Sequence, residues 1–269
     1  MNKVIEERTK RTEWYQDARF GMFIHWGLYA IPSRGEWVRS VEQIPHEDYC
    51  YLTEEFSAEN YNPREWARLA KKAGMKYAVL TAKHHDGFCL YDTKLTDYNS
   101  MNAACHRDLV KEFLEAFREE GIKVGLYFSI IDWRHPDFPH YGDMHHPMRN
   151  HPECSNENRD FDRYLEFMFG QIKELLTNYG KLDLMWFDFS YGDMKCDKWK
   201  AQELISMVRS IQPWLIIDNR LEGSAEDSGS ILTAEPTEYS GDFASPEQMI
   251  PPAGIRNVLG DPVPWEACI

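Results

Sequence analysis

The sequence predicts an α/β protein built on a parallel sheet that closes as a TIM-like (β/α) barrel. Two observations indicate this class. Segments with helical apolar spacing alternate with short apolar runs, and a glycine ends several of the helical segments. Repeated helix–glycine–strand units of this kind give parallel strands joined by right-handed crossovers. No glycine-rich phosphate motif follows the first strand, so a dinucleotide-binding fold is disfavoured and a barrel is expected.

The first strand is expected within residues 20–27, ending at His25, and the first clear helix follows Asn62. Asn62 is a suitable N-cap, Pro63 fits the first turn, and Glu65 lies three residues after the cap. Gly74 can take the left-handed conformation that ends a helix. The residues at helical spacing that form the expected apolar face are Trp66, Leu69, Ala70 and Ala73.

The same unit recurs along the chain. Further helices are expected over 107–120, 160–179 and 198–212, and strands over 76–82, 123–129, 182–189 and 215–218. After residue 221 the periodicity fails, and 222–264 is rich in Gly, Ser, Pro and acidic residues. We therefore expect a single barrel domain over 1–269 in which 222–264 is loop-rich, with at most two short strands, near 231–234 and 264–268.

Composition excludes several classes of function. A net charge of −14 argues against nucleic acid and against an anionic membrane surface as partners. No apolar stretch approaches the roughly 20 residues that span a bilayer. Residues 1–11 are polar and lack the apolar core of a signal peptide, and the six cysteines form no CxxC pair. We expect a cytoplasmic protein with reduced thiols.

Polar side chains stand at the carboxyl end of every expected strand. They are His25-Trp26, His84-His85-Asp86, Tyr127, Asp188 and Asp218-Asn219-Arg220. A single Asp after a strand is more often a cap or a turn residue. Five strand ends of this kind are harder to attribute to turns, because the carboxyl ends of parallel strands meet at one edge. Imidazole, guanidinium, phenol and indole groups together suit a polyhydroxylated ring.

Two chemistries fit such a site. Metal-assisted hydrolysis would use the histidines as ligands, but His84 and His85 are adjacent and would point to opposite faces of a strand. Glycoside hydrolysis needs two carboxylates, of which Asp188 would be one. Spacing does not choose the second among Glu36, Glu235, Glu238, Glu247 and Glu266.

The motifs resemble the catalytic domain of α-L-fucosidases of glycoside hydrolase family 29, from about residue 15 to 268. In order, they are Phe23-Ile-His-Trp-Gly27, Gly35-Glu-Trp37, Lys83-His-His-Asp-Gly-Phe88, Arg107-Asp-Leu-Val110, Gly125-Leu-Tyr-Phe-Ser129 and Leu184-Met-Trp-Phe-Asp188. The Lys-His-His-Asp-Gly-Phe stretch and the Trp-Phe-Asp strand are specific in combination.

This resemblance implies an exo-acting, retaining enzyme that releases fucose from glycans or small fucosides through a covalent intermediate, with no metal and no other cofactor. Asp188 matches the nucleophile. The residues implied to bind fucose are His25, Glu36, Trp37, His84, His85, Tyr127, Trp186 and Arg220.

The acid/base residue is chosen by a family pattern, Asp-Phe-x-Ser/Thr-x-Glu. Residues 242–247 match it, so Glu247 is the first choice. Glu235, in Thr-Ala-Glu, is the second choice, and Glu266, after Trp265, is the third.

The chain departs from the family pattern at two places. Phe189 follows the nucleophile where many members have glycine, which would narrow the leaving-group side. The sequence also stops at Ile269, before an eighth strand and a β-sandwich domain. We therefore expect an incomplete or open barrel whose edges, at Phe23-Ile24 and near Glu266, are covered by self-association or a neighbouring chain. A truncated carbohydrate-binding or assembly-forming protein without activity is the alternative, and a metal-dependent barrel hydrolase is the third hypothesis.

Overall fold

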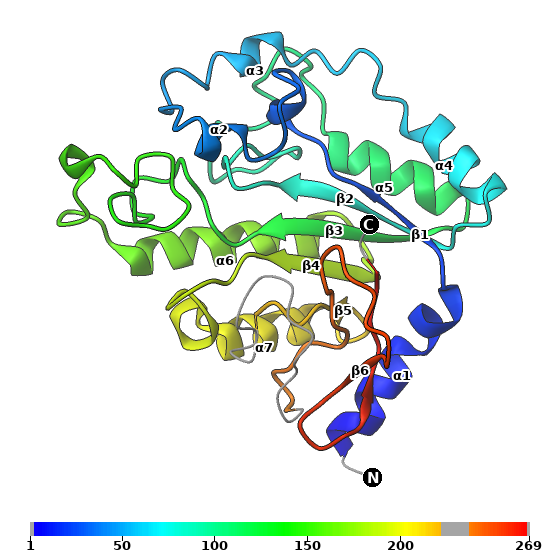
Figure 1. The fold of residues 1–269 in the computed structure, drawn as a ribbon. Coiled ribbons are helices and arrows are strands. Elements are labelled where there is room, and N and C mark those ends of the chain that lie inside the picture. Colours follow the sequence, from blue (N-terminus) through cyan, green and yellow to red (C-terminus); the bar gives the residue numbers. More distant parts are fainter. Residues whose placement is uncertain (1–2, 222–236, 268–269) are drawn as a thin grey trace.

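A five-stranded parallel sheet lies at the centre of the computed structural model, which describes residues 3–221 and 237–267. Its strands follow chain order, and β2, β3 and β4 point the same way in Figure 1. They are β1 (Gly21–Ile24), β2 (Tyr77–Lys83), β3 (Lys123–Ser129), β4 (Leu184–Asp188) and β5 (Ile216–Ile217). The α/β prediction with parallel strands is confirmed.

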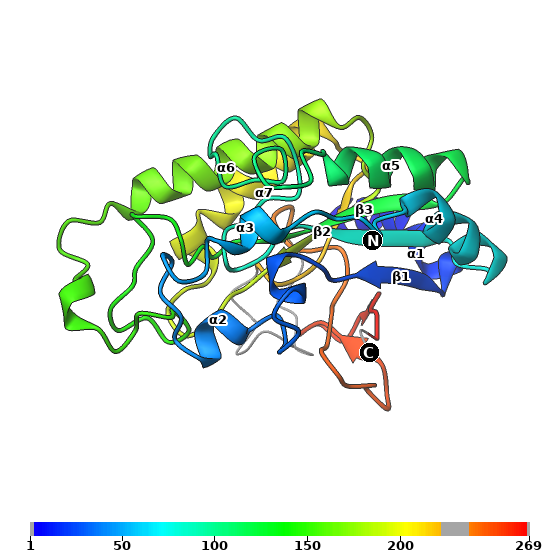
Figure 2. The ribbon, with the colours of Figure 1, turned by 90° about the horizontal axis from the view of Figure 1, so that it is seen from above.

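A helix of ten residues or more lies between each two consecutive strands of this sheet, and α5 and α6 share one face of the sheet (Figure 2). These helices are α4 (Pro63–Lys72), α5 (Leu109–Glu119), α6 (Phe161–Asn178) and α7 (Ala201–Ile211). The predicted cap forms, since the Asn62 side chain accepts from the Glu65 N–H. Gly74, Gly121 and Gly180 all have positive φ after their helices, which glycine adopts without strain.

The expected apolar face of α4 is partly wrong. Leu69 is 55% exposed and Ala73 is also exposed. The buried residues of α4 are Pro63, Ala67 and Ala70, which share a face at i, i+4 and i+7. Small side chains let the helix pack closely there, and Leu69 points away from that face.

Several elements were not predicted. The helix α1 (Lys3–Ala18) buries Arg8, Thr12 and Tyr15, so its inward face is largely polar and gives no apolar periodicity. Short helices α2 (Val38–Val41) and α3 (Leu52–Glu55) lie before α4, and strands β6 (Ile255–Arg256) and β7 (Pro262–Val263) form an antiparallel pair. Among residues 3–221 and 237–267, no helix has the length and apolar character that crossing a membrane requires.

The two short strands expected late in the chain have different outcomes. Residues 231–234 lie outside the described residues. Within 264–267 no strand forms, but Trp265 makes an isolated parallel bridge to Ala244, and Asp218 makes one to Phe243. These bridges continue the parallel order beyond β5.

Alternate residues of the strands face two different clusters. One set packs with α4 to α7, and the other forms an aromatic cluster on the opposite face of the sheet. The second cluster contains Tyr15, Val79, Tyr127, Leu184, Trp186, Ile216 and Phe243. Because Tyr127 and Trp186 belong to it, this cluster lies directly beneath the carboxyl ends of β3 and β4.

Asp242 connects α1, α7 and β5 through one fully buried carboxylate. It accepts from Arg11 Nη2 at 2.9 Å, from Arg209 Nη2 at 2.6 Å and from the Ile217 N–H at 3.0 Å.

Asp242→Asn should leave two guanidinium groups without their counter-charge and lower the free energy of unfolding by about 3 kcal/mol. Urea denaturation measures this, with Asn62→Ala, which removes only a helix cap and should cost about 1 kcal/mol, as the comparison. A loss for Asp242→Asn no larger than that for Asn62→Ala would contradict the role.

Candidate active site

Asp188, the last residue of β4, lies where the carboxyl ends of β2, β3 and β4 meet. Leu184, Trp186 and Asp188 alternate toward the same side of the strand, and Asp188 is only 8% exposed. The Tyr127 hydroxyl donates to its Oδ2 at 2.7 Å, and Arg220 Nη1 donates to its Oδ1 at 3.0 Å. His85 Nε2 lies 3.9 Å from Oδ2.

The charge state of Asp188 is set by opposing effects. Burial raises the pKa of its carboxyl group above the ordinary value, although the Arg220 charge and the Tyr127 hydrogen bond oppose that rise. Because both Asp188 oxygens accept a hydrogen bond, the two donors orient the ionised form of the carboxyl group. An ionised, oriented carboxylate is what a nucleophile at a sugar carbon requires.

Arg220 links Asp188 to a second carboxylate. Its Nη2 lies 3.4 Å from Glu247 Oε2, and Ser245 accepts from the same guanidinium through its hydroxyl, at 3.1 Å, and through its backbone oxygen, at 3.2 Å. The guanidinium carbon is 4.3 Å from the centroid of the Trp186 ring. The Glu247 side chain is 51% exposed, so the second carboxylate stands on the solvent side of the site.

Three imidazole rings stand beside Asp188. The His84 and His85 centroids are 4.0 Å apart, and those of His25 and His84 are 4.7 Å apart. Burial lowers the pKa of His25 to about 4 and also lowers the pKa values of His84 and His85. All three rings are therefore neutral at neutral pH and can exchange hydrogen bonds with hydroxyl groups without adding charge.

The prediction that His84 and His85 point to opposite faces of a strand is wrong. β2 ends at Lys83, with a register shift after Thr81, so His84 and His85 lie in the following chain and turn rather than on a strand. Their rings then lie on the same side instead of on opposite faces. Within the described part of the chain, however, no group of three or more His, Cys, Asp or Glu side chains is arranged to hold a metal ion.

Aromatic rings form one wall of the site. The Trp37 centroid is 4.9 Å from that of His85, 5.5 Å from that of Phe189 and 5.3 Å from that of His145. Glu36 is half-buried, and its charge opposes the lowering of the His25 pKa. The sequence did not point to His145, which lies in an irregular loop without a local pattern.

The other two carboxylates considered for the acid/base role are placed differently. Glu235 lies outside the described residues. Glu266 points into the aromatic cluster beneath the site, where it accepts from Trp186 Nε1 at 2.6 Å and from the Tyr15 hydroxyl at 2.9 Å. Ser245 and Ser129, which hydrogen-bond to Arg220 and His85, were also missed, because a serine carries no distinctive signal in the sequence.

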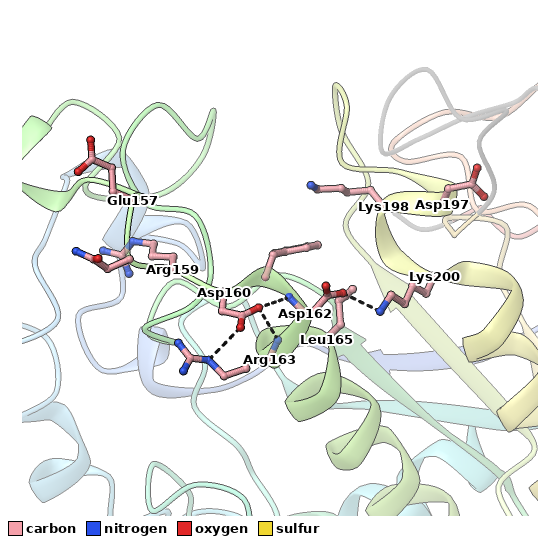
Figure 3. Close-up of a pocket in the computed structure, with 11 residues that line it drawn as sticks. Glu157, Arg159, Asp160, Asp162, Arg163, Leu165, Asp197, Lys198 and Lys200 are labelled. Carbon is pink, nitrogen blue, oxygen red and sulfur yellow. Dashed lines mark hydrogen bonds and ion pairs between the residues drawn. The ribbon is translucent and has the colours of Figure 1, made fainter.

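A separate pocket of about 640 Å³ lies at the start of α6, between residues 157–165 and 197–200 (Figure 3). Two ion pairs lie among its charged side chains, Lys200 with Asp162 at 2.7 Å and Arg163 with Asp160 at 3.7 Å. None of the residues around Asp188 lines it. It is not part of the candidate active site.

A buried carboxylate held by a guanidinium and a phenol, beside neutral imidazoles and indole rings, is the kind of site that glycoside hydrolases use. Comparison with known families narrows this class. The Alpha-L-fucosidase family model matches residues 2–269, and the chain therefore belongs to the α-L-fucosidase family. The resemblance read from the sequence motifs is confirmed.

Relatives of known structure share the fold. The chain is 59% identical to α-L-fucosidase isoenzyme 1 from Paenibacillus thiaminolyticus, with a TM-score of 0.93 over 98% of this chain and 61% of that one. A trapped covalent intermediate of a GH29 α-L-fucosidase from Bacteroides thetaiotaomicron is 30% identical, with a TM-score of 0.79 over 96% of this chain and 59% of that one. Bovine tissue α-L-fucosidase is 36% identical over 221 residues, which cover 74% of this chain and 43% of the bovine protein. The chain thus spans less than two thirds of the length of each of these relatives.

Proposed function

We propose that this chain acts as an exo-acting, retaining α-L-fucosidase on terminal α-L-fucosyl linkages of glycans or small fucosides. One observation carries the proposal: the Asp188 carboxylate is held by Arg220 and Tyr127 beside three neutral imidazoles. The imidazoles and Trp37 would contact the sugar, and Asp188 would face its anomeric carbon. The covalent intermediate trapped in the Bacteroides relative supports the retaining course.

In the first step of this mechanism, Asp188 attacks the anomeric carbon and forms the fucosyl–enzyme ester. The bond to the leaving oxygen breaks as Glu247 donates a proton to that oxygen. In the second step a water attacks the same carbon, Glu247 takes the proton, and Asp188 leaves as the carboxylate. Retaining enzymes place the two carboxyl groups about 5–5.5 Å apart. The contact of both with the Arg220 guanidinium supports such a pairing.

A (β/α) barrel that is open beside β1 is the fold we propose for this domain. The parallel bridges at Phe243 and Trp265 support it, because they continue the strand order beyond β5. A pocket of about 830 Å³ is lined by α1, the start of β1 and residues 262–267. We propose that a second copy of the chain covers this side. Sedimentation at several protein concentrations tests this self-association. A chain that stays monomeric at all of these concentrations would refute it.

Activity on an aryl α-L-fucoside, with and without a chelator, tests the function. We expect fucose to be released in both conditions, with the α-anomer appearing first by NMR. Fucose binding by calorimetry without turnover would instead favour a non-catalytic binding protein. Activity that is lost with the chelator and restored by zinc would favour the metal-dependent hydrolase.

Replacing Glu247 by glutamine tests the acid/base assignment. Hydrolysis of a fucoside with a poor leaving group should slow by about 10³-fold, because that oxygen must be protonated as it departs. A fucoside with an activated leaving group should still form the intermediate, and azide should accelerate turnover and give α-fucosyl azide. Glu235→Gln is the matched comparison. If Glu235→Gln shows this behaviour and Glu247→Gln does not, the assignment moves to Glu235.

A further inference from the structure

Glu266 has a buried carboxylate that the mechanism above does not use. Its Oε1 accepts from Trp186 Nε1 at 2.6 Å, while its Oε2 accepts from the Tyr15 hydroxyl at 2.9 Å and lies 3.5 Å from the Tyr77 hydroxyl. Burial raises the pKa of Glu266, and these donors oppose that rise. All three donors belong to the aromatic cluster beneath the site or pack against it.

Trp186 in turn touches both groups that hold Asp188. Its ring stacks on Tyr127, with centroids 5.5 Å apart and planes 26° apart, and the Arg220 guanidinium lies 4.3 Å from its centroid. Tyr127 donates to one Asp188 oxygen and Arg220 to the other. A rotation of the indole ring would therefore displace both donors.

The bond to Glu266 fixes that rotation. An indole has a single hydrogen-bond donor, and here the donor is directed at a carboxyl oxygen 2.6 Å away. Glu266 is itself anchored, because its backbone N–H donates to the Ala244 oxygen at 3.1 Å and the Ala244 N–H donates to the Pro264 oxygen at 2.8 Å. The carboxylate therefore holds the edge of the indole from a fixed segment.

We infer that Glu266 is a positioning residue for the nucleophile, acting through Trp186 on the Tyr127 and Arg220 donors. It would not protonate the leaving group, because its oxygens are directed at the indole N–H and at tyrosine hydroxyls within the cluster. This inference rests on the proposed fucosidase activity.

The test compares Glu266→Leu, which has no acceptor for the indole N–H, with Trp186→Phe, Tyr15→Phe and the wild type. Glu266→Leu and Trp186→Phe should each lower kcat by about 10²-fold, the cost of a small misplacement of reacting groups, with KM changed by less than about threefold. The loss should be equal for activated and poor leaving groups, and azide should not restore activity. Tyr15→Phe removes a hydrogen bond from the same carboxylate but leaves the Trp186 contact, so it should keep kcat.

Several outcomes would overturn the inference. An unchanged kcat in Glu266→Leu is one. Recovery with activated leaving groups or azide would indicate an acid/base role, and an equal kcat loss in Tyr15→Phe would indicate a general effect on folding. If Glu266→Leu does not fold, Trp186→Phe decides the question, because it removes the indole donor while keeping the carboxylate. Inactive wild-type protein would refute the proposed function instead.

Discussion

Replacing Asp188 by alanine should lower kcat/KM on an aryl α-L-fucoside by about 10⁴-fold. The change removes the proposed nucleophile, which Tyr127 and Arg220 hold in place, and those donors then face an empty position. The fold should persist, because Asp188 lies at the end of β4 and its side chain contacts the site rather than the helices. Steady-state kinetics together with circular dichroism measure the two effects separately.

Rescue by azide and a control variant at an exposed aspartate test the nucleophile assignment further. Azide fits the space left by the carboxylate and attacks from the same face, so Asp188→Ala should recover turnover and yield β-fucosyl azide, the inverted product. Asp197→Ala changes an exposed carboxylate in the pocket of Figure 3 and should keep wild-type kinetics. An Asp188→Ala variant that retains a tenth of the wild-type rate would exclude Asp188 as the nucleophile.

The second large effect is expected at Arg220. Arg220→Met removes the charge that lowers the Asp188 pKa, so that pKa should rise. Activity requires the ionised carboxylate and is lost as pH falls through its pKa. The acid limb of kcat/KM should therefore move to higher pH, and the maximal rate should fall by about 10²-fold.

Arg220→Lys separates charge from geometry. Lysine keeps the positive charge but lacks the planar fork that reaches Asp188, Ser245 and Glu247 at once. The acid limb should move less than in Arg220→Met, while the rate loss should remain. Arg68→Met, at an exposed position of α4, is the control. An acid limb that stays in place or moves to lower pH in Arg220→Met would contradict the electrostatic role.

Much of the sheet could be read from local pattern. The bounds of β3, residues 123–129, match the expected strand, and the cap at Asn62 and the glycines after α4, α5 and α6 lie where expected. These signals are local, because capping, left-handed glycine and apolar runs depend on a few neighbouring residues. The prediction that polar strand ends meet at one edge is confirmed for three of them, since Tyr127 and Arg220 both donate to Asp188.

The elements and contacts that the sequence did not predict depend on contacts between distant segments. The helix α1 buries Arg8, Thr12 and Tyr15, so its sequence shows no apolar periodicity. Phe243 and Trp265 join the sheet through single bridges, too short to show periodicity. The position of Glu266 beneath Trp186 follows from that late bridge, so the sequence offered Glu266 only as one of several candidate carboxylates.

The shared guanidinium has a consequence for pH–rate measurements. Asp188 and Glu247 both contact Arg220, and the Glu247 charge itself raises the pKa of Asp188. The Asp188 pKa therefore depends on the charge that Glu247 carries. The two limbs of a bell-shaped profile then report macroscopic constants of the linked pair, and neither limb belongs to a single residue.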